Sequence, residues 1–159
     1  MSAHLPDDMA DWAQRSVLCW LATVDENGQP HVSPKEIFAV VDTQRIAVAH
    51  LASPGTVRNV RATGKVCLSM IDVLAQKGLK ILGSAVYVPP SAPTFEALSA
   101  PLRRMAGPRF PIHGVVLVTA HAVEPILAPS YRLFPQDTTE ASQIAQARRR
   151  YGLDRPASL

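Results

Sequence analysis

The chain has 159 residues, of which 47% are hydrophobic and 18% are charged, and its formal net charge is +3. These values predict one globular domain with a hydrophobic core. No apolar run approaches the ~20 residues of a membrane span, and the N-terminus lacks a signal-peptide pattern, so we expect a cytoplasmic protein without a membrane partner. The basic clusters lack interleaved aromatic residues, so no nucleic-acid partner is expected.

The first half of the chain has the pattern of short strands joined by tight turns. Asn27-Gly28 supplies the positive φ angles that a hairpin turn needs. Pro34 lies inside a strand-like stretch, which predicts a bulge, an edge position or a break there. The elements expected in this half are a helix over 6–16 and strands over 17–24, 30–36, 37–41 and 46–49.

The second half combines strands with helices. The stretch 115–123 is apolar on both faces, which predicts a central strand that ends before Pro125. Asp137 and Glu140 have the spacing of a capping box and predict a C-terminal helix. The elements expected here are helices over 53–62, 94–105 and 138–151 and strands over 65–71, 79–88 and 115–123. Because strands and helices do not alternate, the pattern favours a mainly β fold, a small antiparallel barrel with added α-helices.

The sequence does not support the common catalytic and metal-binding motifs. It contains no G-x-S-x-G motif and no P-loop. Cys19 and Cys67 lie in apolar stretches and are expected to be reduced core residues. The histidines occur singly rather than at metal-ligand spacing, so no metal site is expected: His4, His31, His50, His113 and His121. The catalytic residues stay unknown, with His31 and His50 as candidates for an acid or a base.

The stretch Ser53-Pro54-Gly55-Thr56-Val57-Arg58-Asn59 follows a hydrophobic strand and has the signature of a helix start. The Ser53 hydroxyl is expected to cap the helix, and Pro54 suits its first position. Free N–H groups and the positive end of the helix dipole make such a start suitable for a phosphate. Two interpretations stay open, a phosphate-binding turn and an ordinary capped helix.

Two further polar stretches, 33–36 and 76–80, interrupt the otherwise apolar strands. If the strands close into a barrel, these stretches converge with the helix start on one rim, which suits a phosphorylated, flat, aromatic ligand. Lys35 and the helix start would hold the phosphate, and groups near Ile37, Val48, Ala49 and Gln76 would line the ring. The alternative is that these stretches carry ordinary solvated lysines at strand ends, namely Lys35, Lys77 and Lys80.

The order and spacing of these stretches resemble the pyridoxamine 5′-phosphate oxidase-related family of FMN-binding split barrels. The resemblance covers about residues 15–125 and is carried by the stretches 21–25, 28–34, 53–61, 65–72 and 78–85. It implies one domain over 1–159, with a core of about 15–125 and a C-terminal helix of about 138–151. The implied fold is a six-stranded antiparallel split β-barrel, and the implied assembly is a homodimer with FMN at its interface.

The resemblance also implies where FMN binds. Ser33, Lys35 and Glu36 fall on the flavin-contacting strand, and Lys77 and Gly78 fall where the family often places a residue that contacts the ring. The residues at the phosphate-binding helix start are Ser53, Thr56, Arg58 and Asn59.

The implied function is that of an FMN-dependent oxidoreductase, a flavoprotein acting on an unknown small substrate. The phosphate turn lacks the arginine pair of true pyridoxamine-phosphate oxidases, and residues 31–36 read His-Val-Ser-Pro-Lys-Glu instead of Arg-x-Val-Leu-Leu-Lys. Two alternatives stay open. One is a deazaflavin-dependent reductase with the same barrel, and the other is a non-enzymatic module that binds flavin or haem.

Overall fold

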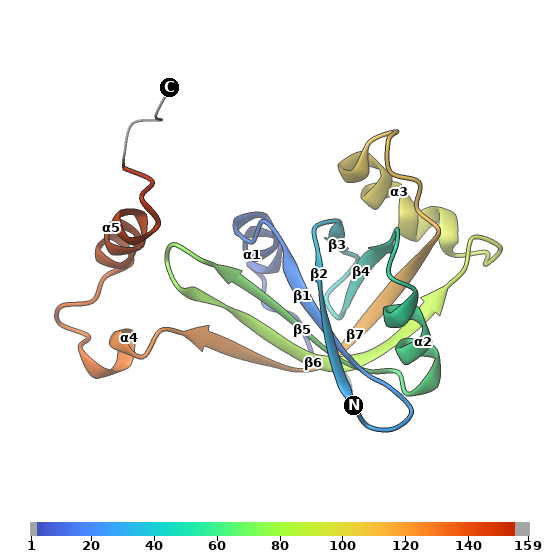
Figure 1. Ribbon diagram of the computed structural model, residues 1–159, viewed down its shortest axis with the longest axis horizontal. Helices are drawn as coiled ribbons and strands as arrows, with labels where there is room; N and C mark the ends of the chain where they lie inside the picture. The colour runs from blue at the N-terminus through green and yellow to red at the C-terminus, as the bar shows by residue number, and fades with distance from the viewer. Residues whose placement is uncertain (1–2, 155–159) are drawn as a thin grey trace.

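The structure is a computed structural model that describes residues 3–154. Its strands form one antiparallel sheet of seven strands in the order β2-β1-β5-β6-β7-β4-β3. The sheet is strongly curled, with α2 and α3 toward one end and α4 and α5 toward the other (Figure 1). The elements are α1 (Met9–Arg15), β1 (Cys19–Val24), β2 (Pro30–Lys35), β3 (Phe38–Val40), β4 (Arg45–His50), α2 (Pro54–Ala62), β5 (Lys65–Asp72), β6 (Lys77–Val88), α3 (Phe95–Ala106), β7 (Gly114–Leu127), α4 (Ser130–Leu133) and α5 (Glu140–Tyr151).

The predicted fold class is confirmed, because the molecule is mainly β, antiparallel and curled into a half-barrel with a few helices. The sheet has the seven strands that the sequence pattern predicts, rather than the six that the resemblance implies. Pro34 lies in β2, at the edge of the sheet, which is one of the positions that a proline in a strand predicts. Within the described part of the chain, no helix is both long and apolar enough to cross a membrane.

A bulge interrupts the pairing of the two longest strands, β6 and β7. The register between β6 and β7 shifts at Leu82/Gly83. A Cβ at Gly83 would lie only 2.1 Å from the Thr119 carbonyl oxygen, so a side chain at this position would separate the strands. A bulge with a glycine lets a strand bend at such a point.

Two hydrophobic clusters occupy opposite faces of β4 and β7. Val116 and Val118 belong to the cluster inside the half-barrel, which also includes residues of α1 and α2. Val115 and Leu117 belong to the cluster beneath α3, with Leu102 as its fully buried helical residue. The prediction that this strand is apolar on both faces because it is central is therefore confirmed. Of the two thiols, Cys19 is buried, Cys67 is half-buried and both are free.

The ends of several elements differ from the sequence-based expectations. β7 continues to Leu127 through Pro125, because β4 pairs with β7 only as far as Thr119 and leaves that edge without a hydrogen-bonding partner. β6 begins at Lys77, inside an expected loop, because Gln76 adopts a positive φ of 54° and tightens the turn.

The helices after β7 also depart from expectation. α4 was not predicted, and α5 is capped by Thr139 with Ser142 rather than by Asp137 with Glu140. The Ser142 N–H donates to Thr139 Oγ1 over 3.1 Å, and the Thr139 N–H donates to Ser142 Oγ over 3.0 Å. The same reciprocal geometry thus forms two residues further along the chain.

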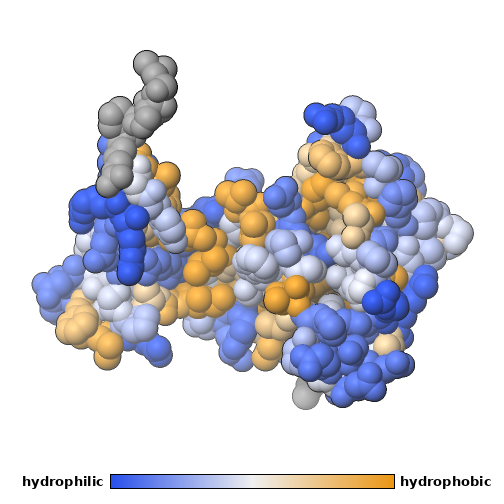
Figure 2. All heavy atoms as spheres, in the orientation of Figure 1, coloured by the Kyte–Doolittle hydropathy of each residue, from blue (hydrophilic) through white to orange (hydrophobic). Residues whose placement is uncertain are grey.

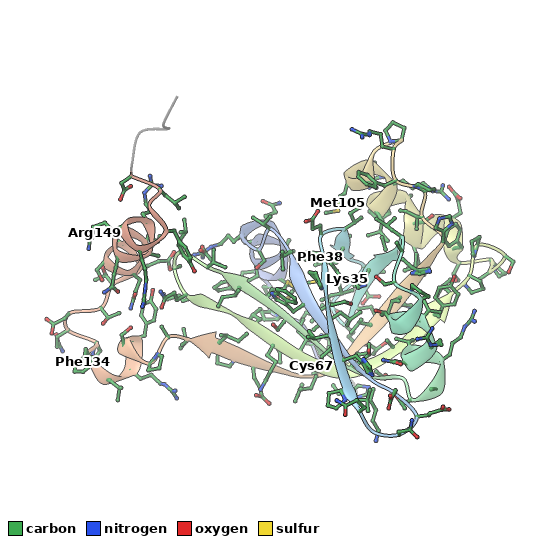
Figure 3. The ribbon with its side chains drawn as sticks, viewed as in Figure 1. Lys35, Phe38, Cys67, Met105, Phe134 and Arg149 are labelled. Carbon is green, nitrogen blue, oxygen red and sulfur yellow. The ribbon has the colours of Figure 1, made fainter. Side chains whose placement is uncertain are left out.

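Residues 128–154 form a C-terminal arm that projects beyond the end of the sheet, and Figure 3 places Phe134 and Arg149 there, remote from Lys35. Tyr131 Oη donates to the Ala75 carbonyl over 2.7 Å. Glu140 joins Arg15 over 2.6 Å and Lys77 over 3.2 Å, and Arg15 also joins Asp72 over 2.9 Å. These contacts, which we call the arm anchor, attach α4 and α5 to α1 and to the β5–β6 turn.

Candidate functional site

Helix α2 is held against the first two strands by polar side chains. Ser33 Oγ on β2 lies 3.2 Å from Thr56 Oγ1, and Asn59 Nδ2 donates to Thr23 Oγ1 on β1 over 3.0 Å. Asn59 is buried, so its amide supports the helix from beneath rather than presenting a free donor. Val57 and Val60 on the same helix are buried as well. The start of α2 is therefore fixed beside the ends of β1 and β2.

A cavity of about 780 Å³, which we call the α2 hollow, lies between α2 and the β1–β2 hairpin. Its volume is within the range of small-molecule sites. Its walls are rich in hydroxyl, amide and guanidinium groups. They include Thr23, Asp25, His31, Val32, Ser33, Ser53, Gly55, Thr56, Arg58, Asn59 and Arg61.

The Ser53 hydroxyl does not cap α2, so that prediction was wrong. Ser53 Oγ instead accepts a hydrogen bond of 2.6 Å from Lys35 Nζ, because the buried ammonium needs an acceptor. As a result, no side chain of the described residues caps the first turn of α2. Gly55 and Thr56 in that turn line the hollow, which therefore receives the positive end of the helix dipole.

The α2 hollow is lined by two guanidinium groups, Arg58 and Arg61, and by two carboxylates of the β1–β2 turn, Asp25 and the exposed Glu26. Arg58 and Arg61 make no salt bridge with any residue in the range 3–154, and the Arg61 guanidinium lies 4.7 Å from the Tyr87 ring centroid. Asp25 also lines the hollow, but its carboxylate accepts N–H groups of its own turn and lies 3.3 Å from His31 Nε2. These interactions hold the pKa of Asp25 below its usual value, and the hydrogen bond from the Gln29 N–H has the largest effect.

Lys35 lies behind the α2 hollow rather than in its wall. Its side chain, at the end of β2 (Figure 3), is only 8% exposed. Lys35 and Glu36 line a second, smaller cavity of about 280 Å³, which we call the Lys35 hollow. Ser53 lines both cavities and links them. The structure thus brings Ser33, Ser53, Thr56, Arg58 and Asn59 together at one cavity and Lys35 and Glu36 at its neighbour.

Lys77 and Gly78 lie at the other end of the sheet. Lys77 is opposite Asp72 on β5, whereas Thr23 of the α2 hollow is opposite Val66 near the other end of that strand. Lys77 belongs to the arm anchor, with its ammonium 4.5 Å from the Tyr131 ring centroid. A Cβ at Gly78 would lie 2.0 Å from the Met70 carbonyl oxygen, so this glycine is required by strand packing. These two residues therefore do not line the α2 hollow.

Arg61 was not singled out from the sequence as a site residue. It follows Arg58 by three residues in a helix, and this spacing puts two side chains on the same face. This spacing is the sequence signal that could have placed Arg61 beside Arg58. The described residues contain no cluster of three or more His, Cys, Asp or Glu side chains that could hold a metal.

Three solved structures show the same fold as this chain. HupZ from Group A Streptococcus is 22% identical, with a TM-score of 0.64 over 75% of this chain and 91% of that one. An FMN-binding protein from Syntrophomonas wolfei is 15% identical, with a TM-score of 0.63 over 74% and 82%. HutZ, the haem storage protein from Vibrio cholerae, is 18% identical, with a TM-score of 0.61 over 79% and 95%.

No curated protein matches this sequence. The family described as pyridoxamine 5′-phosphate oxidase matches residues 5–129, which include the whole sheet and both cavities. The chain therefore belongs to the pyridoxamine 5′-phosphate oxidase family.

Proposed function

We propose that this protein binds FMN, with the phosphate in the α2 hollow, and that it is an oxidoreductase acting on a small substrate. The observation that carries the proposal is the uncapped start of α2, which opens into a cavity where Arg58 and Arg61 make no salt bridge with any described residue. Helix N–H groups and guanidinium groups are the donors that a phosphate dianion prefers. The Ser33 and Thr56 hydroxyls, 3.2 Å apart, add two further hydrogen-bonding groups.

The chain's own residues would bind and orient the cofactor. Arg58 and Arg61 balance the phosphate charge, and Ser53 is oriented by Lys35 from behind. FMN supplies the redox chemistry when it is bound, while the protein supplies position and electrostatics. Lys77 and Gly78 are not part of this proposed site within the same protomer, because they lie at the arm anchor.

An uncovered apolar face borders the α2 hollow. Val32, Ala22, Cys67 and Leu82 lie directly opposite one another across β2, β1, β5 and β6. Val32 is 62% exposed and Leu82 is 37% exposed, and Trp20 in the neighbouring row is 43% exposed. Figure 2 shows hydrophobic residues at the surface between the arm and α2.

We infer that a second copy of the chain covers this apolar face. Large exposed apolar patches are typical of interaction sites, and symmetric dimers are the commonest homo-oligomers. Because Val32 belongs both to the apolar face and to the wall of the α2 hollow, FMN bound there would lie at the dimer interface.

The cofactor is tested by the visible spectrum of the purified protein and by titration. Bound FMN gives a yellow protein with an absorption band near ~450 nm. We expect the apoprotein to quench FMN fluorescence and to bind FMN at least about tenfold more tightly than riboflavin, since the phosphate contacts are lost with riboflavin. Absence of quenching, or equal affinity for the two ligands, would contradict the proposed phosphate site.

The same preparation separates the alternatives. A Soret band would identify haem, rather than FMN, as the ligand. Tighter binding of a deazaflavin than of FMN would identify the deazaflavin as the cofactor. Steady oxidation of a nicotinamide reductant by the FMN-loaded protein is expected of an oxidoreductase. Tight FMN binding without turnover, with any nicotinamide donor or added electron acceptor, would contradict the oxidoreductase part of the proposal. The protein would then be a non-enzymatic module that binds FMN.

The dimer is tested with a charge on the apolar face. Leu82→Glu places a carboxylate on that face and is expected to give a monomer in analytical ultracentrifugation. Val73→Glu is the matched control, because Val73 is 54% exposed but lies in the β5–β6 turn. A Leu82→Glu variant that sediments as a dimer would show that another surface forms the interface.

A further inference from the structure

The Lys35 hollow has the character of a binding site of its own. Its volume of about 280 Å³ lies between the ends of β2 and β4, the start of β3 and the loop after α3. The walls are mostly apolar and come from Ile37, Ala49, Leu51 and Phe110. Lys35 is its buried cation, and the exposed Glu36 stands at its rim.

Lys35 is a buried cation without a counter-charge among the described residues. The residue is 8% exposed, and its ammonium group donates a hydrogen bond to Ser53 Oγ. An ammonium group has three donors, and no carboxylate of residues 3–154 forms a salt bridge with this one. Burying an unpaired charge is costly, so an anion that enters the hollow would gain an already desolvated partner.

Two basic groups near the polar end of the Lys35 hollow, Lys35 and His50, have lowered pKa values. Burial lowers the pKa of Lys35, and no carboxylate of the described residues counters that effect. Burial and then the Lys35 charge lower the pKa of His50, whose Nδ1 is buried and has no hydrogen-bond partner in the described part of the chain. The polar end of the hollow is therefore suited to a negative group.

The size and lining of the hollow set the shape of the ligand. An apolar cavity of about 150 Å³ accepts a benzene molecule, so about 280 Å³ suits one ring or a short aliphatic chain rather than a flavin. Phe110, which is 54% exposed, offers an aromatic face for stacking. Its loop begins at Gly107, whose φ is +68°, and contains Pro108 and Pro111, which restrict the backbone on either side of the ring.

We propose that the Lys35 hollow binds a small apolar monocarboxylate, with the carboxylate on Lys35 Nζ and Ser53 Oγ and the apolar body between Leu51 and Phe110. The Glu36 carboxylate at the rim disfavours a second negative charge on the ligand. The cavity is a neighbour of the one proposed for the phosphate, and Ser53 lines both. If the proposed FMN site is correct, this ligand would lie beside the flavin and would be the substrate class of the enzyme.

The test uses benzoate and its neutral analogue benzamide as probes, titrated by calorimetry into the full-length protein without FMN. We expect benzoate to bind with a Kd of about 1 mM or tighter and benzamide to bind about tenfold more weakly, because it lacks the charge-assisted bond. Absence of saturable benzoate binding up to about 10 mM, or equal affinity for the two probes, would overturn the proposal.

Three variants locate the binding. Lys35→Met keeps the length of the side chain without the charge and is expected to reduce benzoate affinity about tenfold or more, to the level of benzamide. Phe110→Ala is expected to weaken both probes about fivefold through loss of the stacking wall. Lys77→Met is the matched control at a distant lysine and should leave both affinities unchanged. Benzoate affinity retained in Lys35→Met, with folding verified by circular dichroism, would assign the carboxylate to another site.

The outcome is separable from that of the proposed FMN site. Arg58→Gln removes a charge from the α2 hollow only, so it should weaken FMN and leave benzoate affinity unchanged. If the protein does not bind FMN but binds benzoate more tightly than benzamide, only the proposed function is refuted. If it binds FMN but does not prefer benzoate to benzamide, only this inference is refuted.

Discussion

The two ends of the curled sheet use positive charge in opposite ways. At the arm anchor, Arg15 and Lys77 each contact a carboxylate, and Glu140 contacts both of them. At the α2 end, Arg58 and Arg61 face a cavity without a salt bridge to any described residue. The comparison shows that a cation paired with a carboxylate supports the fold, whereas an unpaired cation at a cavity is available to a ligand.

The comparison predicts the largest effect for ligand binding. The double variant Thr56→Val/Arg58→Gln should raise the Kd for FMN about 100-fold, because it removes a hydroxyl and a charged donor from the proposed phosphate site. Riboflavin affinity should change little. Lys77→Gln at the arm anchor should leave both affinities within about twofold, as measured by fluorescence titration. A comparable loss of FMN affinity in Lys77→Gln would remove the distinction between the two ends.

Replacing a lysine by methionine should change the stability in opposite directions at the two ends of the sheet. Lys35→Met should raise the free energy of unfolding of the apoprotein by about 1–3 kcal/mol, because it replaces a buried unpaired charge by an apolar side chain. Lys77→Met should lower it by less than about 1 kcal/mol, because its pair with Glu140 is partly exposed. Urea denaturation of the two variants measures the change in the free energy of unfolding for each. A destabilised Lys35→Met protein would show that the charge of the Lys35 ammonium is already balanced in the wild type.

The attachment of the C-terminal arm to the sheet should depend mainly on the Glu140 carboxylate. Glu140→Gln weakens contacts to both Arg15 and Lys77, so we expect faster proteolysis of the arm with a stability loss of only about 1 kcal/mol. Glu124→Gln is the matched control, since Glu124 is similarly exposed and forms a pair with Lys80 in the sheet. Equal proteolysis of the two variants would mean that the arm is held by its other contacts.

The smallest expected effect is a pH dependence of the arm anchor. The Lys77 contact and then the Arg15 charge lower the pKa of Glu140 below its usual 4.5. Burial alone would raise the pKa of Asp72, but the Ala75 N–H and Arg15 together bring it below 3.8. The contribution to stability is therefore complete above about pH 5 and is lost as the pH falls through the lowered values. The difference in Tm between the wild type and Glu140→Gln should be constant from about pH 5 to pH 8 and should shrink below about pH 4.

The sequence predicted most of the elements because their signals are local. Asn27-Gly28 gave the hairpin, Pro54 gave the start of α2, and the apolar stretch 115–123 gave the central strand. The resemblance of widely spaced stretches gave the family, which the matched residues 5–129 confirm. Periodicity and turn chemistry act within a few residues, so they can be read from the chain alone.

The site was harder to predict because it depends on partners that are distant in sequence. Lys77 and Lys35 are both lysines at strand ends, and only the fold brings Glu140 to the first and leaves the second unpaired among the described residues. Ser53 has every local feature of a helix cap, yet its hydroxyl bonds Lys35, 18 residues earlier. A residue's type and spacing therefore indicate its chemistry, whereas its charge partner decides its role.

The order of the strands in the sheet also has a consequence for how the chain folds. Hairpins β1–β2, β3–β4 and β5–β6 join neighbours in sequence, whereas β4–β7 joins strands from opposite halves of the chain. Loop closure over such a distance is slow compared with hairpin formation, so the non-local pairing should set the folding rate. Until β7 docks, both hydrophobic clusters lack a wall, and the chain is most exposed to aggregation in that interval.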